Sequence, residues 1–230
     1  MARRVDLTLY LVTDTVLCGS RGVAATVEAA VHGGVTVVQV RDPLASDEEF
    51  IRLGRAVAAA LAGTGVPLIV NDRVHLVEAI GADGAHVGQG DLDPIAARSL
   101  LGPAAILGLS VQTPAHVDAA AALPPGTVDH LGVGPVWWQA TKPDAADPGG
   151  LDTLAAIVRR SPLPCVAIGG IDAARAPLVR SAGAAGVAVV SAICGTPDPV
   201  AAARRVRAAW DGADSPTTPP VRKLDRPESG

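Results

Sequence analysis

Short apolar runs rich in valine, isoleucine and leucine alternate along the chain with longer stretches in which alanine and leucine recur. An apolar run of about four to eight residues beside a turn signal predicts a buried strand, and the longer stretches predict helices that cover it. The pattern repeats eight times before residue 211. The predicted strands span 7–14, 35–42, 67–72, 84–89, 105–111, 130–136, 164–170 and 186–193.

Helix-start signals follow several of these strands. Ser46 stands three residues before Glu49, the spacing of a capping box, and Pro94, Pro114 and Pro199 stand where a first helical turn accepts proline. Eight strand–helix units in about 200 residues are typical of a single (β/α)8 TIM barrel, whereas a doubly wound sheet needs fewer strands. The predicted helices span 23–32, 46–62, 74–80, 94–101, 114–122, 150–160, 172–182 and 199–210.

The end of the chain has a different composition from the rest. Residues 211–230 are rich in proline, serine and charged residues and contain no aromatic residue. Such a segment cannot bury enough apolar surface to fold. We therefore predict a barrel domain over 1–210 and a disordered tail over 211–230.

Charge and cysteine content exclude several classes of protein. Nineteen Lys and Arg against 23 Asp and Glu give a net charge of −4, with no basic block, so no nucleic-acid partner is expected. No apolar run is long enough for a membrane span. Cys18, Cys165 and Cys194 lack metal-ligand or disulfide spacing, so we expect reduced thiols in a cytoplasmic protein.

Polar residues gather where the predicted strands end, which is the end at which TIM barrels hold their active sites. Asp72 and Asp91 follow neighbouring strands, and two carboxylates with room for water and substrate suit Mg²⁺. The alternative is that Asp72 caps the next helix and Asp91 caps a loop. His86 lies inside a predicted strand and is expected to be packed and hydrogen-bonded, not catalytic.

Several residues at the same end suit a phosphorylated ligand. Arg41 and Lys142 supply cations, unless they are simply solvated surface charges. Gly169-Gly170 and Val190-Ser191 follow the last two strands, where barrels build phosphate cradles from backbone N–H groups; tight turns are the alternative. Trp137 and Trp138 suit a stack on an aromatic ligand, a hydrophobic lid, or a contact between copies in a homo-oligomer.

Nine short motifs in this order resemble thiamine-phosphate synthase, over about residues 9–203. They are YLVTD at 10–14, QVR at 39–41, NDR at 71–73, GADGAHVGQGD at 81–91, GLS at 108–110, GVGP at 132–135, TKPDA at 141–145, AIGGI at 167–171 and VVSAI at 189–193. The resemblance implies a (β/α)8 transferase that joins hydroxymethylpyrimidine diphosphate to a thiazole phosphate and releases pyrophosphate. The C–O bond breaks first, and the thiazole nitrogen captures the pyrimidine methyl cation.

The resemblance also implies roles for individual residues. Mg²⁺ on Asp72 and Asp91 would neutralise the diphosphate. Arg41, Lys142 and Ser110 would act in catalysis, Gly170, Val190 and Ser191 would bind the thiazole phosphate, and Gln39 would position the pyrimidine. The implied substrate-binding set is Gln39, Arg41, Asn71, Ser110, Gln139, Thr141, Lys142, Gly170, Val190 and Ser191.

Two departures from the family pattern leave other functions open. The family pattern is an arginine, an acidic residue and then a lysine, and this chain has Arg41-Asp42-Pro43, so Pro43 replaces the lysine. In the loop after the sixth predicted strand, Gln139 replaces a threonine. A non-catalytic thiazole- or thiamine-phosphate-binding protein is therefore one alternative. A thiazole tautomerase is the other, although that relative has a histidine where Pro135 stands and lacks the metal-binding aspartates.

Overall fold

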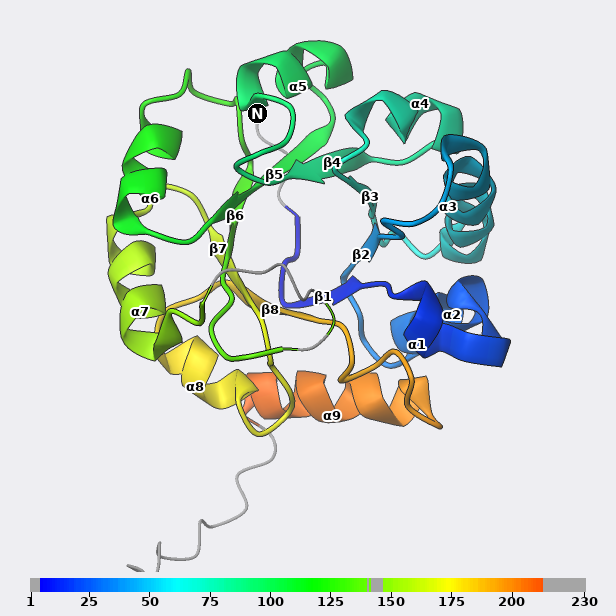
Figure 1. Ribbon diagram of the computed structural model, residues 1–230. Helices are drawn as coiled ribbons and strands as arrows, with labels where there is room; N and C mark the ends of the chain where they lie inside the picture. The colour runs from blue at the N-terminus through cyan, green and yellow to red at the C-terminus, as the bar shows by residue number, and fades with distance from the viewer. Residues whose placement is uncertain (1–4, 140, 142–146, 213–230) are drawn as a thin grey trace, which may run out of the picture.

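A computed structural model describes residues 5–139, 141 and 147–212 of the chain. Eight parallel strands pair in the order of the sequence, and β1 also pairs with β8, so the sheet closes into a barrel (Figure 1). The predicted (β/α)8 architecture is confirmed. The strands are β1 (Leu9–Val12), β2 (Val37–Val40), β3 (Leu68–Asn71), β4 (Gly84–Val87), β5 (Ile106–Val111), β6 (His130–Val133), β7 (Cys165–Ile168) and β8 (Gly186–Val189).

Helices form an outer ring around the strands, as Figure 1 shows. The α-helices are α1 (Thr15–Cys18), α2 (Val23–His32), α3 (Asp47–Leu61), α4 (Val77–Ile80), α5 (Pro94–Leu101), α6 (Pro114–Ala121), α7 (Gly150–Arg160), α8 (Ala176–Ser181) and α9 (Pro199–Asp211). Two 3₁₀ helices, η1 (Gly19–Arg21) and η2 (Val74–Leu76), precede α2 and α4.

Local capping explains where several helices begin. The Ser46 side chain accepts from Glu49 N–H while the Glu49 carboxylate accepts from Ser46 N–H, so the predicted capping box is confirmed. Asp93 and Asp198 cap α5 and α9 through their carboxylates. The helix predicted from residue 172 begins only at Ala176, after a turn in which the Asp172 carboxylate accepts from a backbone N–H.

The apolar residues divide into two clusters on either side of the barrel wall. Leu9 and Leu11 point outward into the main core between strands and helices, and Tyr10 and Val12 point into the barrel. This alternation is the side-chain period of a strand. The inner cluster also contains Leu7, Val37, Ile69, Ile106, Val166 and Ala188.

Two imidazole rings occupy space inside the barrel that branched apolar residues usually fill. The rings of His86 and His130 have centroids 5.7 Å apart, and His130 is 2% exposed. A Cβ atom on Gly108 would lie 2.3 Å from His86 Nδ1 and 2.5 Å from His130 Nε2, and one on Gly132 would lie 2.8 Å from His86 Cε1. The two glycines therefore make room for the rings.

Two further expectations concern the C-terminal tail and the absence of a membrane-spanning helix. Helix α9 continues through Asp211, one residue past the predicted domain boundary, and the predicted tail at 213–230 lies outside the described residues. Within the described part of the chain, no helix has both the length and the apolar character that crossing a bilayer requires.

Candidate active site

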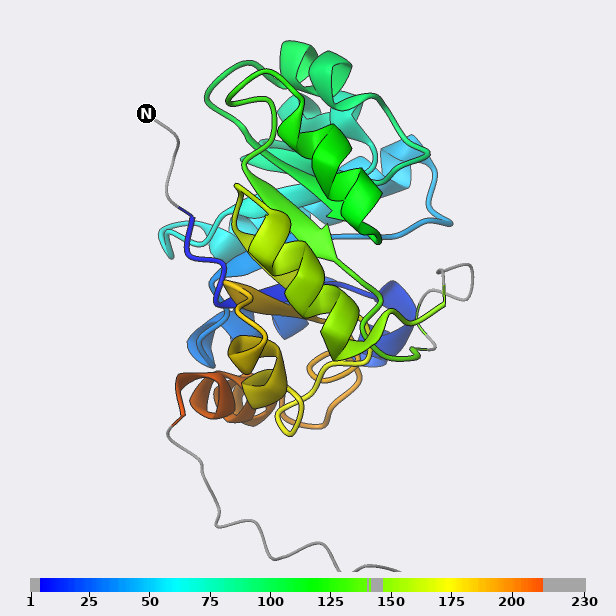
Figure 2. The same ribbon diagram turned by 90° about the vertical axis from the view of Figure 1, so that its left-hand side faces the viewer.

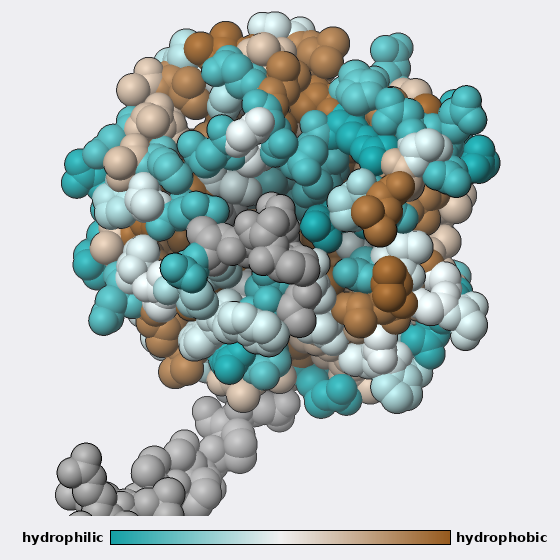
Figure 3. All heavy atoms as spheres, in the orientation of Figure 1, coloured by the Kyte–Doolittle hydropathy of each residue, from teal (hydrophilic) through white to brown (hydrophobic). Residues whose placement is uncertain are grey.

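The predicted polar site residues that the structure describes lie at one end of the barrel. Figure 1 looks onto this end, and Figure 2 shows it from the side, on the right. Hydrophilic side chains gather around the centre of this face, and most of its hydrophobic patches lie further out (Figure 3). We call this end the mouth; it comprises the carboxyl ends of the strands and the loops that follow them.

Asp72 follows β3 in an unusual backbone conformation. Its φ is +58°, and it is the only non-glycine residue with a positive φ in the described part of the chain. Asp and Asn tolerate this left-handed region better than other side chains. The Asp72 N–H donates to the His86 carbonyl on β4 at 2.9 Å, and Asn71 Nδ2 donates to Asp72 Oδ2 at 2.6 Å. The Asp72 carboxylate is therefore held at the mouth by both backbone and side-chain contacts.

The helix-cap alternative for Asp72 needs correction. The next residue, Arg73, donates to the Asp47 carboxylate at 3.0 Å and to the Ala45 carbonyl. The following helix η2 has Arg73 at its N-cap and no side-chain capping bond, so Asp72 is not a helix cap.

Asp91 lies in the loop after β4, beside the strand that precedes Asp72. Its Oδ2 accepts the Gly88 N–H at 2.7 Å, so it does stabilise a loop, as the structural alternative predicted. The next helix is capped by Asp93 and not by Asp91. The Asp91 side chain is exposed at the mouth.

The two carboxylates at this edge of the sheet suit Mg²⁺, which takes its other ligands from water and substrate, better than a metal whose ligands all come from the protein. No group of three or more His, Cys, Asp or Glu side chains with metal-ligand geometry occurs in the described residues. Mg²⁺ is commonly bound through one or two carboxylates while water and substrate phosphates complete its octahedron. Asp72 and Asp91 supply that number of carboxylates on neighbouring strands.

Gln39 and Arg41 lie at the end of β2. Gln39 is buried inside the barrel, and its Nε2 donates to the Tyr10 hydroxyl at 3.0 Å. This bond turns the amide oxygen of Gln39 away from Tyr10. The Arg41 backbone N–H is held by the buried Thr13 hydroxyl at 3.0 Å. The half-buried Arg41 guanidinium has no hydrogen bond or ion pair with any residue of the described chain, so it suits an anionic ligand.

Ser110 lies on β5, and two neighbours on the mouth hold it. His86 Nε2 and Ser110 Oγ are 2.9 Å apart, and Gln89 Nε2 donates to the Ser110 carbonyl at 2.7 Å. The expectation that His86 is packed and hydrogen-bonded is confirmed. Next to it, burial lowers the pKa of His130 to about 4, and neither ring nitrogen of His130 has a hydrogen-bond partner among the described residues.

Gly170 follows β7, and neighbouring residues pack closely around it. Its φ is +64°, and a Cβ atom there would lie 2.6 Å from the Trp138 carbonyl oxygen. The Gly170 carbonyl accepts from Arg175 Nη1, and the Arg175 guanidinium lies over the Trp137 ring, 5.0 Å from its centroid. Arg175 was not predicted as a site residue, because only the folded chain brings it to Gly170 and Trp137.

Val190 and Ser191 begin the turn after β8. The Val190 carbonyl accepts from the N–H groups of Ile193 and Cys194, at 3.1 and 2.8 Å. No acceptor in the described residues is bonded to the N–H of Gly170 or Ser191. Both N–H groups are thus available for a phosphate, as the cradle hypothesis requires.

The loop after β6 is only partly described. Thr141 Oγ1 donates to Gln139 Oε1 at 2.7 Å, so the two predicted substrate contacts touch each other. Trp138 is 76% exposed, whereas Trp137 is partly buried beneath Arg175. Lys142, a predicted catalytic residue, lies outside the described residues.

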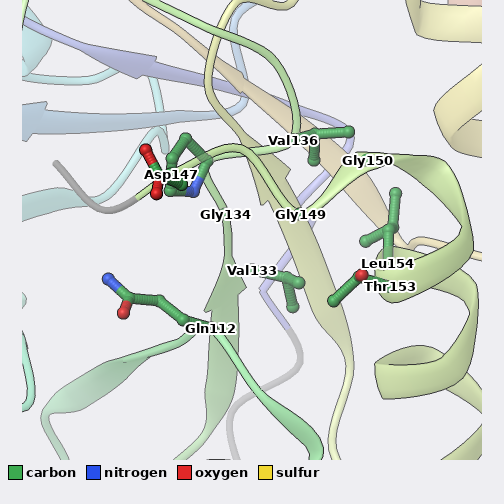
Figure 4. A pocket seen from close by; sticks show the side chains of 10 residues that line it. Gln112, Val133, Gly134, Val136, Asp147, Gly149, Gly150, Thr153 and Leu154 are labelled. Atoms are coloured by element: carbon green, nitrogen blue, oxygen red, sulfur yellow. The ribbon is translucent and has the colours of Figure 1, made fainter.

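A separate small pocket lies beside the loops that follow β5 and β6 (Figure 4). Its walls come from Gln112, residues 133–136 and the first turns of α7. None of the predicted substrate-binding residues lines it. The pocket is therefore separate from the predicted substrate-binding residues.

Comparisons with known proteins agree on one family. The model of a family described as thiamine monophosphate synthase matches residues 9–193. A thiamine-phosphate synthase from Azorhizobium caulinodans is 47% identical over 207 residues, which are 90% of this chain and 96% of that protein. One from Xanthobacter autotrophicus is 50% identical over 209 residues, 91% of this chain and 98% of that protein.

Solved structures show the same relation. Thiamine phosphate pyrophosphorylase from Pyrococcus furiosus superposes with a TM-score of 0.80 at 30% identity, covering 90% of this chain and 96% of that one. A 3-hexulose-6-phosphate synthase superposes with a TM-score of 0.64 at 18% identity over 88% of this chain and 99% of that one, and shares the fold alone.

Proposed function

Because this chain belongs to the thiamine monophosphate synthase family and is an enzyme of the transferase class, we propose its reaction in detail. It condenses 4-amino-5-hydroxymethyl-2-methylpyrimidine diphosphate with 4-methyl-5-(2-phosphoethyl)thiazole, or with its carboxylate form, to give thiamine phosphate and pyrophosphate. The observation that supports the proposal is the convergence of Gln39, Asn71, Asp72 and Ser110 on one mouth, at the carboxyl ends of β2, β3 and β5.

The diphosphate is the leaving group, and its negative charge grows as the C–O bond breaks. Arg41 has a guanidinium without a partner in the described chain, and Asn71 on β3 and Ser110 on β5 carry side-chain donors at the same mouth. Donors that are already oriented stabilise developing charge without reorganising during the reaction. Lys142 is proposed to add a second cation to the same oxygens.

Asp72 and Asp91 would hold Mg²⁺ at this position. When bound, the ion would neutralise oxygens of the diphosphate as a Lewis acid. Asn71 contributes in a second way, because its amide N–H fixes one oxygen of the Asp72 carboxylate at 2.6 Å. We propose that this contact orients the carboxylate toward the mouth.

The two organic substrates need to meet face to face. Gln39 is proposed to accept from the pyrimidine amino group through its amide oxygen, since its Nε2 is engaged with Tyr10. The N–H groups of Gly170 and Ser191, which follow β7 and β8, are proposed to bind the thiazole phosphate beside the guanidinium of Arg175. Gln139 and Thr141 would complete that wall. Holding both reactants in one site supplies the proximity that speeds their union.

The loop after Arg41 forms a turn that contains Pro43 in place of the family's lysine. The Asp42 carboxylate accepts from Thr15 Oγ1 at 2.8 Å and from the Leu44 N–H at 3.1 Å, so residues 42–44 form a tight turn. Pro43 suits such a turn. We propose that Arg41 is the cation this loop gives to the diphosphate, and losing one charged contact slows catalysis without abolishing it.

The test is to incubate the purified chain with both substrates and Mg²⁺ and to measure thiamine phosphate after oxidation to fluorescent thiochrome. Product that forms only with both substrates, and that EDTA abolishes, supports the proposal. The absence of product beside an active synthase control would overturn it. Tight binding of thiazole phosphate without turnover would instead favour the binding-protein alternative.

The tautomerase alternative is tested in the same preparation. Isomerisation of the thiazole carboxylate phosphate without any pyrimidine substrate would support it. Pro135 offers no acid or base at the position concerned, so we expect no isomerisation.

A further inference from the structure

The loops that follow β6 and β7 meet at the side chain of Arg175. The Arg175 backbone is fixed in the turn before α8, because its N–H donates to the Asp172 carboxylate at 3.0 Å. The side chain reaches back from this turn: Nη1 donates to the Gly170 carbonyl, and the guanidinium carbon lies 5.0 Å from the centroid of the Trp137 ring. The half-buried Arg175 therefore touches the glycine whose N–H, with that of Ser191, forms the proposed phosphate cradle.

The charge of Arg175 is not neutralised by a carboxylate anywhere in residues 5–139, 141 and 147–212. No ion pair within these residues includes its guanidinium, and the Asp172 carboxylate meets the backbone N–H instead. A guanidinium carries five N–H donors. The Gly170 carbonyl takes one of them, and the contact with the Trp137 ring is made by the charge. The other donors are available for the oxygens of a ligand.

The N–H of Gly170 points toward β8. The Gly169 carbonyl accepts from the Trp137 N–H at 3.1 Å, on the β6 side. The peptide bond between the two glycines is trans, so its N–H points away from its C=O. The register of β7 and β8, continued past the strand ends, places Gly170 beside Val190, the residue before Ser191. The guanidinium on the Gly170 carbonyl therefore lies at the edge of the cradle.

A phosphate monoester suits this combination of groups. It carries a charge of about −1.5 to −2 at pH 7 and offers three strong acceptor oxygens. Backbone N–H groups supply hydrogen bonds but no net charge, whereas an arginine binds phosphate with both charge and two parallel N–H···O bonds. Arg175 supplies the cation that the two N–H groups of the cradle lack.

We propose that Arg175 binds the phosphate of the thiazole substrate and makes this site select the phosphate ester over the free thiazole alcohol. The inference rests on the function proposed above and adds to it a specificity-determining residue. Trp137 is a positioning residue in this arrangement, because its ring holds the guanidinium in place. A site built around a charged partner rejects an analogue that lacks it, since the buried polar groups are then left unpaired.

A purely structural role for Arg175 has different consequences. The side chain would then only tie the loop after β6 to the loop after β7, and its loss would loosen the whole wall of the mouth. Such loosening would weaken the binding of thiazole phosphate and of thiazole alcohol by the same factor. A direct contact with the phosphate affects the phosphate ester alone.

The test compares Arg175→Gln, Arg175→Lys and Arg175→Ala in the full-length chain. Glutamine keeps an N–H donor for the Gly170 carbonyl without the charge, and lysine keeps the charge without the planar fork. Isothermal titration calorimetry, with and without pyrophosphate and Mg²⁺, measures the binding of thiazole phosphate and of thiazole alcohol, which has the same ring and no phosphate. The thiochrome assay gives the KM for each substrate.

We expect the glutamine variant to bind thiazole phosphate about tenfold to a hundredfold more weakly, as for the loss of one charge-assisted contact, and to change thiazole alcohol binding and the KM for pyrimidine diphosphate less than about twofold. Lysine should restore part of the loss. Arg180→Gln is the matched control and should bind thiazole phosphate like the unaltered chain. Arg180 is also on α8 and also donates to a backbone carbonyl, that of Trp210 at 2.8 Å, but it lies in the last turn of the helix and contacts α9.

Two results would overturn the proposal. One is unchanged thiazole phosphate binding in Arg175→Gln, and the other is an equal loss for thiazole phosphate and thiazole alcohol. Circular dichroism checks the folding of each variant, and the glutamine and lysine variants carry the test if the alanine variant does not fold. Calorimetry needs no turnover, so a chain that binds thiazole phosphate through Arg175 but makes no thiamine phosphate would overturn only the proposed reaction.

Discussion

Replacing Asp72 by asparagine, alanine and glycine in turn separates the charge of this residue from its backbone conformation. At a φ of +58° an ordinary side chain is strained, by roughly 1–2 kcal/mol per residue, while asparagine and glycine are tolerated. Asparagine also keeps an oxygen that can accept from Asn71. The three variants therefore share the loss of charge but differ in backbone strain.

The expected stabilities follow from that difference. The free energy of unfolding of Asp72→Asn should differ from that of the unaltered chain by less than about 0.5 kcal/mol, as is usual for surface substitutions. Asp72→Ala should be less stable than Asp72→Asn by about 1 kcal/mol, which lowers the melting temperature by about 2–4 °C in a domain of this size. Urea unfolding followed by circular dichroism measures the free energies.

Activity should respond to charge alone. Removing one charge-assisted contact costs about 1.5–3 kcal/mol, so all three variants should lose about tenfold to a hundredfold or more in kcat/KM in the thiochrome assay. Asp93→Asn is the matched control, because Asp93 only caps α5 and asparagine caps equally well. Full activity in Asp72→Asn would refute the charge argument, and equal stability of the alanine and asparagine variants would refute the strain argument.

Three further predictions concern the barrel interior and its rim. Gly108→Ala should lower the free energy of unfolding in urea by about 1–3 kcal/mol, because the added Cβ would meet two imidazole rings. Gly90→Ala is the control and should leave this free energy unchanged, since no atom lies within 4 Å of its added Cβ. Equal losses in the two variants would contradict the prediction. The depressed pKa of His130, about 4 against an ordinary 6.5, means that only the unfolded chain binds the proton between these values. The free energy of unfolding should therefore fall by on the order of 3 kcal/mol as pH drops from 6.5 to 4, and His130→Phe should remove this part of the pH dependence in denaturant titrations. Arg98→Ala should cost about 3–5 kcal/mol, since Arg98 pairs with the largely buried Asp129 at 2.7 Å and binds three backbone carbonyls, and a loss under 1 kcal/mol would contradict that.

The strand–helix order was predictable because its signals are local. Apolar runs, capping residues and prolines act within a few neighbours, and the capping box at Ser46 has the same form in the sequence and in the structure. The short helix α1 was missed because four residues carry no readable period. The late start of α8 was missed because the Asp172 turn competes with a helix.

The site was predictable where its residues follow strands and less so where distant segments meet. Asn71, Asp72, Gln39 and Ser110 reach the mouth because parallel strands end there. Arg175 reaches Gly170 through a long side chain, and the ion pair of Arg73 with Asp47 joins the N-cap of η2 to the start of α3. Neither contact has a signature along the sequence, because each depends on how the loops are placed in space.

The pairing of β1 with β8 makes the barrel a ring in which the first and last units are neighbours like any others. Both ends of the described chain lie on the side opposite the mouth (Figure 2). Chain ends so placed tolerate relocation, since circular permutation joins the old ends and opens new ones in an exposed loop. A version of this enzyme that starts in the exposed turn at Gly63, between α3 and β3, would keep every strand pair and every residue of the mouth. The closed barrel therefore does not depend on which of its strand–helix units comes first in the chain.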